Sequence, residues 1–400
     1  MLAKDYIAME EEFGAHNYHP LDVVIEKGDG VWVYDVEGKK YLDCLAAYSA
    51  VNQGHCHPRI IGAMKKQADQ ITLTSRAFRN SQLPLLYKQL NEMTGYPKFL
   101  PMNSGAEAVE TAIKAARKWG YKVKGVEEDK AEIIVCTNNF AGRTVTIVGF
   151  STEAQYKDGF GPFSPGFKVV EYGNAKELEE AITPNTVAFI VEPIQGEGGV
   201  VVPPAGYLKS AEETCKKNNV LFITDEIQSG LGRSGKLFAF EYEDVKPDAV
   251  IIGKALSGGA YPVSGVLASE EVLGVFNPGD HGSTFGGNPL GASIAIEALK
   301  VLDEEKLIEN SYELGNYFRE QLSAIPSKHV KEIRGKGLFI GVELHNEAKG
   351  ARRFCEALAN RGILCKETHD NVIRFAPPLV IKKEEIDWAL GHIKEVLLMD

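Results

Sequence analysis

The chain has 400 residues, of which 44% are hydrophobic, and a formal net charge of −11 at pH 7. This length suits two or three domains, and the negative charge argues against nucleic acid as the main ligand, because phosphate backbones are bound by clustered lysine and arginine. No apolar run is long enough to span a membrane, and residues 1–6 lack the hydrophobic core of a secretory signal, so we predict a cytoplasmic protein.

The first sixty residues combine a hairpin pattern with polar turns. Residues 31–35 alternate in polarity, a turn follows at 37–39, and the alternation resumes at 41–43, which is typical of a β-hairpin. The pair of histidines in His55-Cys56-His57 could suggest a metal site. However, neighbouring side chains of an extended chain point in opposite directions and the six cysteines form no Cys-x-x-Cys pair, so we predict neither a metal site nor a disulfide scaffold.

Residues 101–119 contain a clear signal for the start of a helix. Ser104 is followed three positions later by Glu107, the pattern of a capping box, and the helix is predicted to run to about residue 119. A helix N-terminus made of small residues exposes free amide groups and suits a phosphate. By itself, however, this pattern is more often an ordinary capped helix.

Strand-like and helix-like segments alternate from residue 132 to residue 253, which is typical of an α/β fold with a mostly parallel central sheet. The predicted strands are 132–137, 167–171, 187–192, 220–224 and 249–253, and the predicted helices between them include 175–183 and 205–218. Polar, glycine-rich loops at 139–144 and 192–199 separate them, and such loops often carry function.

Two of these apolar runs end in residues with useful chemistry, Asp225 and Lys254. The carboxyl ends of parallel strands meet at one edge of a sheet, where ligands bind, so both side chains should emerge there. An amine that can form a Schiff base, beside a carboxylate that can hold a protonated ring nitrogen, is the minimal protein equipment for pyridoxal phosphate. Each residue alone would more often be a salt-bridge partner.

The stretch 230–236 nearly matches a phosphate-binding P-loop, but Leu237 stands where the motif needs serine or threonine, so we reject a nucleotide triphosphatase. From residue 331 the pattern changes to short glycine-containing strands followed by helices. We therefore predict an N-terminal segment at 1–50 that packs with the small domain, a large cofactor-binding domain at 51–289 and a smaller α+β domain at 290–400.

Taken together, several stretches resemble the class III (subgroup II) aminotransferases, which are pyridoxal-phosphate enzymes of fold type I. The matching stretches are 103–107 (NSGAE), 192–197 (EPIQGE), 225–230 (DEIQSG), 253–259 (GKALSGG) and 281–289 (HGSTFGGNP). Within the class, 17–20 (NYHP) and 48–58 (YSAVNQGHCHP) are most similar to the ornithine aminotransferase branch.

The resemblance implies roles at the cofactor. Lys254 would bind pyridoxal phosphate covalently and then move a proton at the substrate carbon. Asp225 would keep the ring nitrogen protonated, Phe140 would stack on the ring, and Gln228 would bond the ring hydroxyl.

The same resemblance places the cofactor phosphate. Ser104, Gly105 and Ala106 would bind it at the helix N-terminus. Ser283 and Thr284 would contact it as well, with Thr284 reaching the phosphate of the neighbouring subunit, which implies a working homodimer.

The implied substrates are L-ornithine and 2-oxoglutarate, which one site must accept in turn. Arg143 would bind the carboxylate far from the reacting centre, and Arg374 would bind the 2-oxoglutarate carboxylate beside it. Ornithine has no carboxylate there, so we hypothesise that Glu197 neutralises Arg374 in that half-reaction and releases it in the other. Tyr18 and Tyr48 would contact the α-amino and carboxylate end of ornithine.

Alternatives stay open at this point. An acetylornithine aminotransferase would share nearly all cofactor residues but should not need the tyrosine pair, and a γ-aminobutyrate aminotransferase is less favoured for the same reason. An aminomutase, a decarboxylase or a non-catalytic homologue could use the same scaffold. Ala141 departs from the larger residue of many relatives, and this could relax specificity.

Overall fold

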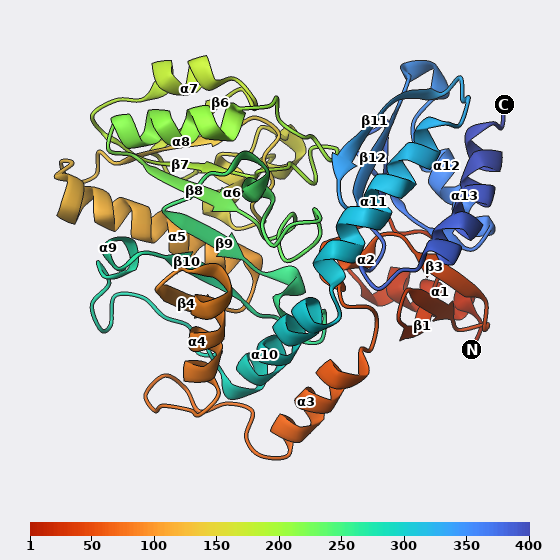
Figure 1. Cartoon of the computed structure of the whole chain (residues 1–400), viewed down its shortest axis with the longest axis horizontal. Coiled ribbons are helices and arrows are strands. Elements are labelled where there is room, and N and C mark those ends of the chain that lie inside the picture. The colour runs from red at the N-terminus through yellow and green to blue at the C-terminus, as the bar shows by residue number, and fades with distance from the viewer.

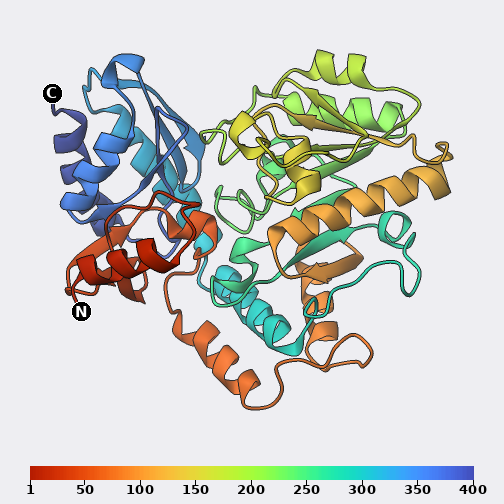
Figure 2. The same ribbon diagram turned by 180° about the vertical axis from the view of Figure 1, so that it is seen from behind.

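A computed structural model describes residues 1–400, and its chain folds into three β-sheets with helices packed around them (Figures 1 and 2). The largest sheet has seven strands, in the spatial order β4 (Lys98–Met102), β10 (Ser264–Ala268), β9 (Ala249–Ile252), β8 (Leu221–Asp225), β7 (Thr186–Val191), β5 (Glu132–Cys136) and β6 (Phe167–Val170). β10 runs opposite to the other six strands, and all the remaining pairs are parallel. The predicted α/β fold with a mostly parallel sheet is therefore confirmed.

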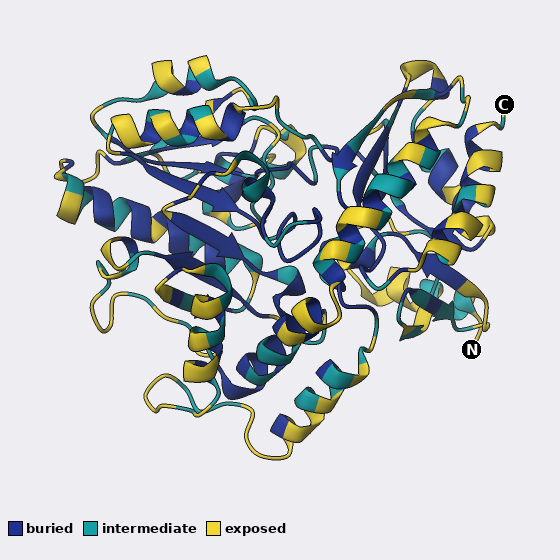
Figure 3. Ribbon diagram, in the orientation of Figure 1, coloured by how far each residue is buried: buried dark blue, intermediate teal, exposed yellow.

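The five inner strands of this sheet, β10, β9, β8, β7 and β5, are almost entirely buried, as Figure 3 shows by their dark colour. In β8, Leu221 and Ile223 pack into the same apolar cluster as helix α5 (Gly105–Trp119), whereas Phe222 packs into the cluster of α8 (Tyr207–Lys217). Alternate residues of a strand point to opposite faces. A strand covered on both sides must therefore be apolar throughout, which is why these runs were recognisable in the sequence.

Two strands of the sheet, β4 and β10, were not predicted. β4 contains Pro101, which cannot donate a ladder hydrogen bond and is tolerated because the strand lies at the sheet edge. β10 contains Gly265, where a Cβ would lie 2.4 Å from the carbonyl oxygen of Leu100. Proline and glycine are uncommon in strands, so both residues weaken the sequence signal. Only the packing shows why each of them is present here.

Two smaller four-stranded sheets lie together on the other side of the molecule (Figures 1 and 2). One has the order β1 (Ile25–Asp29), β2 (Trp32–Asp35), β3 (Lys40–Asp43) and β13 (Ile363–Leu364), and the other has the order β11 (Val330–Lys336), β12 (Phe339–Leu344), β15 (Val372–Phe375) and β14 (Lys366–Thr368). β2 and β3 form the predicted hairpin. β13 pairs with β3, so the N-terminal segment is joined to the C-terminal part of the chain. The three-part domain division stays a prediction, and this pairing is in keeping with it.

The remaining helices are α1 (Ala3–Phe13), α2 (Ala46–Ser49), α3 (Pro58–Ala68), α4 (Leu83–Thr94), α6 (Val145–Gly149), α7 (Ala175–Ala181), α9 (Glu270–Leu273), α10 (Pro289–Glu304), α11 (Leu307–Ser323), α12 (Arg352–Asn360) and α13 (Lys383–Leu397). Helix α10 packs beside α3 and α4 below the large sheet, and α11, which follows it in the chain, lies against the C-terminal sheet (Figure 1). None of the helices combines the length and the apolar character that crossing a membrane requires.

Candidate active site

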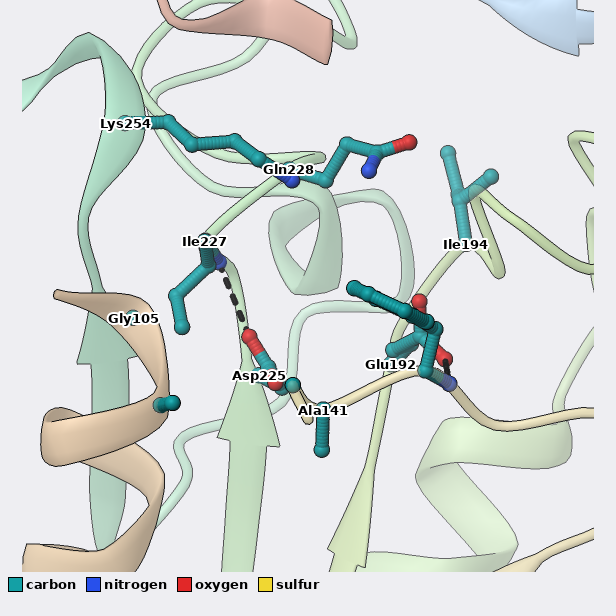
Figure 4. Close-up of a pocket in the computed structure, with 11 residues that line it drawn as sticks. Gly105, Ala141, Glu192, Ile194, Asp225, Ile227, Gln228 and Lys254 are labelled. Atoms are coloured by element: carbon teal, nitrogen blue, oxygen red, sulfur yellow. Dashed lines mark hydrogen bonds between the residues drawn. The ribbon is translucent and has the colours of Figure 1, made fainter. Parts of the chain in front are cut away.

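A pocket opens at the carboxyl ends of β8 and β9, and Asp225 and Lys254 both line it (Figure 4). Asp225 is the last residue of β8, and Lys254 follows β9 by two positions. The two strands run parallel, with Asp225 opposite Ile251. The prediction that both residues reach the same edge of the sheet is therefore confirmed.

Burial shifts the pKa of both groups towards their neutral forms. Asp225 is 5% exposed, and burial raises the pKa of its carboxyl to about 6, although the backbone N–H of Ile227, 3.0 Å from Oδ1, and Lys254 act in the opposite direction. Burial lowers the pKa of the Lys254 amine, while Glu197 raises it and Arg374 lowers it. The pocket thus holds a carboxylate that would gain from a cationic partner and an amine that loses its proton more readily than usual.

The N-terminus of α5 forms one wall of the pocket through Gly105 and Ala106. Ser104 and Glu107 form the predicted capping box, in which Ser104 Oγ accepts the Glu107 N–H and Glu107 Oε2 accepts the Ser104 N–H at 2.8 Å. The N–H groups of Gly105 and Ala106, in the first turn, have no intrahelical acceptor. Gly142 lies against this turn with φ at +128°, and a Cβ there would come within 2.9 Å of the Ala106 side chain.

Phe140 also lines the pocket, and Glu192 holds its backbone in place. Glu192 Oε2 accepts the Phe140 N–H at 3.1 Å, and Oε1 accepts the Gly196 N–H at 3.3 Å. Burial, followed by the charge of Asp225, raises the pKa of Glu192 to about 8. Glu192 begins the stretch 192–197, yet its structural role could not be predicted from the sequence.

Three side chains form a polar network next to the pocket. The Arg374 guanidinium, in β15, donates from Nη1 to Glu197 Oε1 at 2.8 Å and to Gln228 Oε1 at 3.1 Å. Gln228 Nε2 donates to Glu197 Oε1 at 3.2 Å. Burial alone would raise the pKa of Glu197, but the Arg374 charge and hydrogen bond, together with Lys254, outweigh burial and lower it. The structure therefore brings together the predicted pair, Glu197 and Arg374, as an ion pair beside Lys254.

Gly196 makes this arrangement possible. A Cβ at position 196 would lie 1.9 Å from Gln228 Oε1. No side chain other than hydrogen fits there while Gln228 keeps its place. The structure uses the Gln228 amide to bridge Glu197 and Arg374, and the predicted bond to a cofactor hydroxyl stays a prediction.

Tyr48 covers the other side of Arg374, with the guanidinium carbon 4.8 Å from the ring centroid. It belongs to α2, whose residues Ala46, Ala47, Tyr48 and Ser49 all have positive φ, between 46° and 73°. A left-handed conformation costs L-residues with a Cβ roughly 1–2 kcal/mol each. Four such residues in succession, none of them glycine, form a strained turn that the surrounding structure must hold.

Arg143 lies in the loop after Phe140, and its guanidinium stacks on aromatic rings instead of pairing with a carboxylate. Its guanidinium carbon lies 3.6 Å from the Tyr156 ring centroid and 5.6 Å from that of Phe140. Burial and, to smaller extents, Glu197 and Tyr18 raise the pKa of Tyr156 against the effect of Arg143. Tyr156 was missed because it ends a three-residue 3₁₀ helix that carries no sequence motif. An arginine stacked on aromatic rings is free to bind an incoming carboxylate.

The remaining predicted residues lie farther out. Tyr18 is 77% exposed and lies near enough to Tyr48 and Tyr156 to make small contributions to their raised pKa values. Ser283 Oγ accepts from Asn103 Nδ2 at 2.8 Å, and Thr284 is exposed. Neither Ser283 nor Thr284 lines the pocket of its own chain, so their predicted contact with a phosphate stays a prediction.

The pair of histidines near the N-terminus has ordinary partners. His55 Nε2 donates to Asp43 Oδ2 at 2.7 Å, and His57 lies 3.2 Å from Glu305. Their rings therefore make separate contacts with separate carboxylates.

The pocket residues suit pyridoxal phosphate. A half-buried lysine and a buried carboxylate face one cavity, an aromatic ring borders it, and the free amides of a helix N-terminus close one end. These are the groups that a covalently bound pyridine ring with a phosphate requires.

Comparisons with known proteins identify the class. The family model described as aminotransferase class-III matches residues 13–397. The chain belongs to the class-III aminotransferases, which are enzymes that use pyridoxal phosphate.

Individual relatives show which members of the class the chain is similar to. An ornithine aminotransferase of Geobacillus sp. (strain WCH70) is 62% identical over 392 residues, which cover 98% of both chains. The crystal structure of the ornithine aminotransferase from Toxoplasma gondii ME49 has a TM-score of 0.98 at 46% identity and covers 100% of this chain and 95% of its own. The acetylornithine aminotransferase from Elizabethkingia anophelis has a TM-score of 0.91 at 48% identity and covers 100% of this chain and 99% of its own.

Proposed function

We propose that the protein is an ornithine δ-aminotransferase, which moves the δ-amino group of L-ornithine to 2-oxoglutarate. The products are glutamate and glutamate-5-semialdehyde, and the latter cyclises to pyrroline-5-carboxylate. The observation that carries the proposal is the ion pair between Glu197 and the buried Arg374 beside Lys254. The 62% identity with a protein of this name supports it.

The chemistry at the floor of the pocket follows from two residues. Bound pyridoxal phosphate supplies the carbonyl that takes up an amino group and the ring that withdraws electrons from the substrate carbon. Asp225 would hold the proton on the ring nitrogen, and this contact would offset the cost of keeping its own carboxylate buried. Lys254 Nζ would hold the cofactor and then move the proton at the reacting carbon, since burial favours its neutral, basic form.

The ion pair explains how one pocket accepts two unlike substrates. The reacting δ-carbon of ornithine carries no carboxylate, so Arg374 stays on Glu197 in that half-reaction. Glutamate and 2-oxoglutarate carry a carboxylate beside the reacting carbon, and it would replace Glu197 on Arg374. Arg143 would bind the distal carboxylate of each substrate, with Tyr18 and Tyr48 at the α-amino end of ornithine.

The test uses purified protein loaded with pyridoxal phosphate, whose visible absorption reports transfer of an amino group. L-Ornithine alone should bleach the visible band, and 2-oxoglutarate should restore it while pyrroline-5-carboxylate accumulates. N-Acetylornithine is the matched second donor. Bleaching by the acetylated donor alone would move the protein to acetylornithine transamination. A Lys254→Ala variant is the control and should show neither change with ornithine.

The proposal includes a cytoplasmic homodimer. Thr284 is exposed outside its own pocket, and the nearby Phe285 is 48% exposed, which suits a surface that reaches a second copy. Sedimentation of the wild type should give a dimer mass. A Thr284→Ala variant should bind pyridoxal phosphate more weakly while remaining a dimer, and unchanged cofactor affinity would contradict this role.

A further inference from the structure

We propose that Asp43 and His55 are positioning residues that hold the left-handed turn α2 and thereby keep Tyr48 over Arg374, which makes them determinants of substrate choice. The inference rests on the proposed function, because the choice concerned is that between ornithine and glutamate. Neither residue lines the pocket that contains Lys254. Their effect must therefore pass through the turn.

Asp43 grips the start of the turn. It is the last residue of β3, and its backbone N–H donates to Val31 at 2.9 Å. Its Oδ1 accepts the N–H groups of Leu45 at 2.8 Å and Ala46 at 3.0 Å. The carboxylate therefore fixes the two amides that lead into the left-handed residues, as a capping side chain does at a helix N-terminus.

His55 fixes the other oxygen of the same carboxylate. Its Nε2 lies 2.7 Å from Asp43 Oδ2, and since a carboxylate only accepts, the ring donates. The His55 backbone is itself anchored, because it exchanges two hydrogen bonds with Gly30, at 2.7 and 3.1 Å. Gly28 makes room for the ring, since a Cβ there would lie 2.8 Å from His55 Cβ. Asp43 thus cannot rotate without losing a partner that is held elsewhere.

The turn needs such a grip. Ala46, Ala47, Tyr48 and Ser49 have φ values of 49°, 46°, 59° and 73°, and each would adopt a right-handed or extended conformation more readily. Ser49 is buried, and its Oγ has no hydrogen-bond partner. The backbone N–H groups of Tyr48 and Val51 donate to Leu45 and Ala46 at 3.1 Å and close the turn, but the turn contains no glycine that would favour its left-handed conformation. A strained segment persists when its surroundings over-determine it, and such segments cluster at functional sites.

The hydrogen bonds of Asp43 fix the turn and thereby place Tyr48. Its ring lies 4.8 Å from the guanidinium carbon of Arg374, which is 1% exposed and paired with Glu197. A turn that relaxes would carry Tyr48 away and open Arg374 to water and to any carboxylate. Ornithine gains from a covered Arg374, whereas glutamate must reach it. Loss of Asp43 should therefore harm ornithine more than glutamate.

The first experiment measures single-turnover bleaching of the loaded enzyme by each donor. Asp43→Ala should lower the ornithine rate at subsaturating donor by about tenfold or more, with a change in the glutamate rate of less than about threefold. Asp43→Asn keeps an acceptor for Leu45 and Ala46, and its amide can donate to His55 Nε2 when the ring carries its proton on Nδ1, so this variant should behave like the wild type. An equal loss with both donors would overturn the proposal, because a purely structural brace would not distinguish them.

A double-mutant cycle tests whether the effect passes through Tyr48. In a Tyr48→Ala background, Asp43→Ala should leave the ornithine-to-glutamate ratio unchanged, since the two residues act in series. A further change of the same size would overturn the proposal. If Asp43→Ala does not fold, His55→Ala carries the same cycle, because it removes an anchor outside the turn.

A readout without substrate separates this inference from the proposed function. Hydrogen exchange of residues 45–50, measured by mass spectrometry, should be about tenfold faster in Asp43→Ala and unchanged in Asp43→Asn. Ala47 is exposed, and Ala47→Gly tolerates the left-handed turn without strain, so adding it to Asp43→Ala should slow exchange again. Equal exchange in all variants would refute the proposal that Asp43 holds the turn. A wild type that rejects ornithine while showing these exchange rates would refute only the proposed substrate.

Discussion

Replacing Glu197 with alanine should convert the pocket from one that prefers ornithine to one that prefers glutamate. Arg374 is 1% exposed, and its closest partner is Glu197 at 2.8 Å. Removal of one member of a buried ion pair costs roughly 3–5 kcal/mol, because the other charge is left without compensation. The Glu197 side chain is 24% exposed, so solvent screening places the expected cost near the lower end, at about 3 kcal/mol.

The free-energy cost of leaving Arg374 unpaired also determines the change in selectivity. In the wild type a carboxylate beside the reacting carbon must displace Glu197, whereas in Glu197→Ala it meets an unpaired guanidinium. At about 1.4 kcal/mol per factor of ten, 3 kcal/mol corresponds to a shift of about a hundredfold in the ratio of glutamate to ornithine. The free protein should lose stability, and a bound dicarboxylate should restore part of that loss.

Single-turnover rates with each donor, taken over a range of donor concentrations, give the ratio directly. Glu297→Ala is a suitable control. The Glu297 side chain has similar exposure, and it pairs at 2.7 Å with Arg59 of helix α3, outside the pocket. That variant should leave the ratio unchanged. A Glu197→Ala enzyme that folds, binds pyridoxal phosphate and keeps the wild-type ratio within about threefold would refute the ion-pair reasoning.

Two further substitutions test particular contacts. Gly196→Ala places a methyl group 1.9 Å from Gln228 Oε1, so Gln228 must leave Glu197 and Arg374, and the ornithine rate should fall about tenfold. Gly62→Ala is the control, because its Cβ would meet nothing within 4 Å, and it should leave the rate unchanged. Equal rates in both variants would contradict the packing argument. Burial raises the pKa of Glu226 to about 8, so the stability that its protonated form contributes is complete below pH 4.5 and is lost as the pH rises towards 8. Glu226→Gln stays neutral, and its melting temperature relative to the wild type should therefore rise by roughly 2–4 °C between pH 5.5 and 8.5; parallel melting curves would show that the wild-type carboxyl is already ionised at the lower pH.

The parts of the site that the sequence predicts are those whose signals are local. Asp225 and Lys254 follow continuous apolar runs, and such runs are recognisable because a parallel strand covered on both faces tolerates nothing polar. The capping box at Ser104 requires only four adjacent residues. In both cases the chemistry lies within a few positions of the element that places it.

The parts that sequence patterns alone do not predict depend on contacts between distant segments. Glu197 and Arg374 are 177 positions apart, and their pairing was inferred from a family resemblance rather than from any spacing. Tyr156 ends a short 3₁₀ helix without a sequence motif, and its role becomes visible only because Arg143 stacks on it. The turn at 46–49 has no glycine to announce its left-handed conformation, because its cause is a carboxylate held by a histidine from another segment.

The residues with local sequence signals are those that the chemistry needs, and the residues without such signals are those that we propose to select the donor. The central sheet supplies Lys254 and Asp225, which the chemistry needs with any amino donor. The residues that we propose to distinguish donors come from the N-terminal turn, the loop that contains Glu197 and β15, and they meet at Arg374. Glu197 raises and Arg374 lowers the pKa of Lys254, so their effects on the amine oppose each other. If a substrate carboxylate takes the place of Glu197, Arg374 remains paired in both half-reactions, and the environment of the catalytic amine changes little while the preferred donor changes.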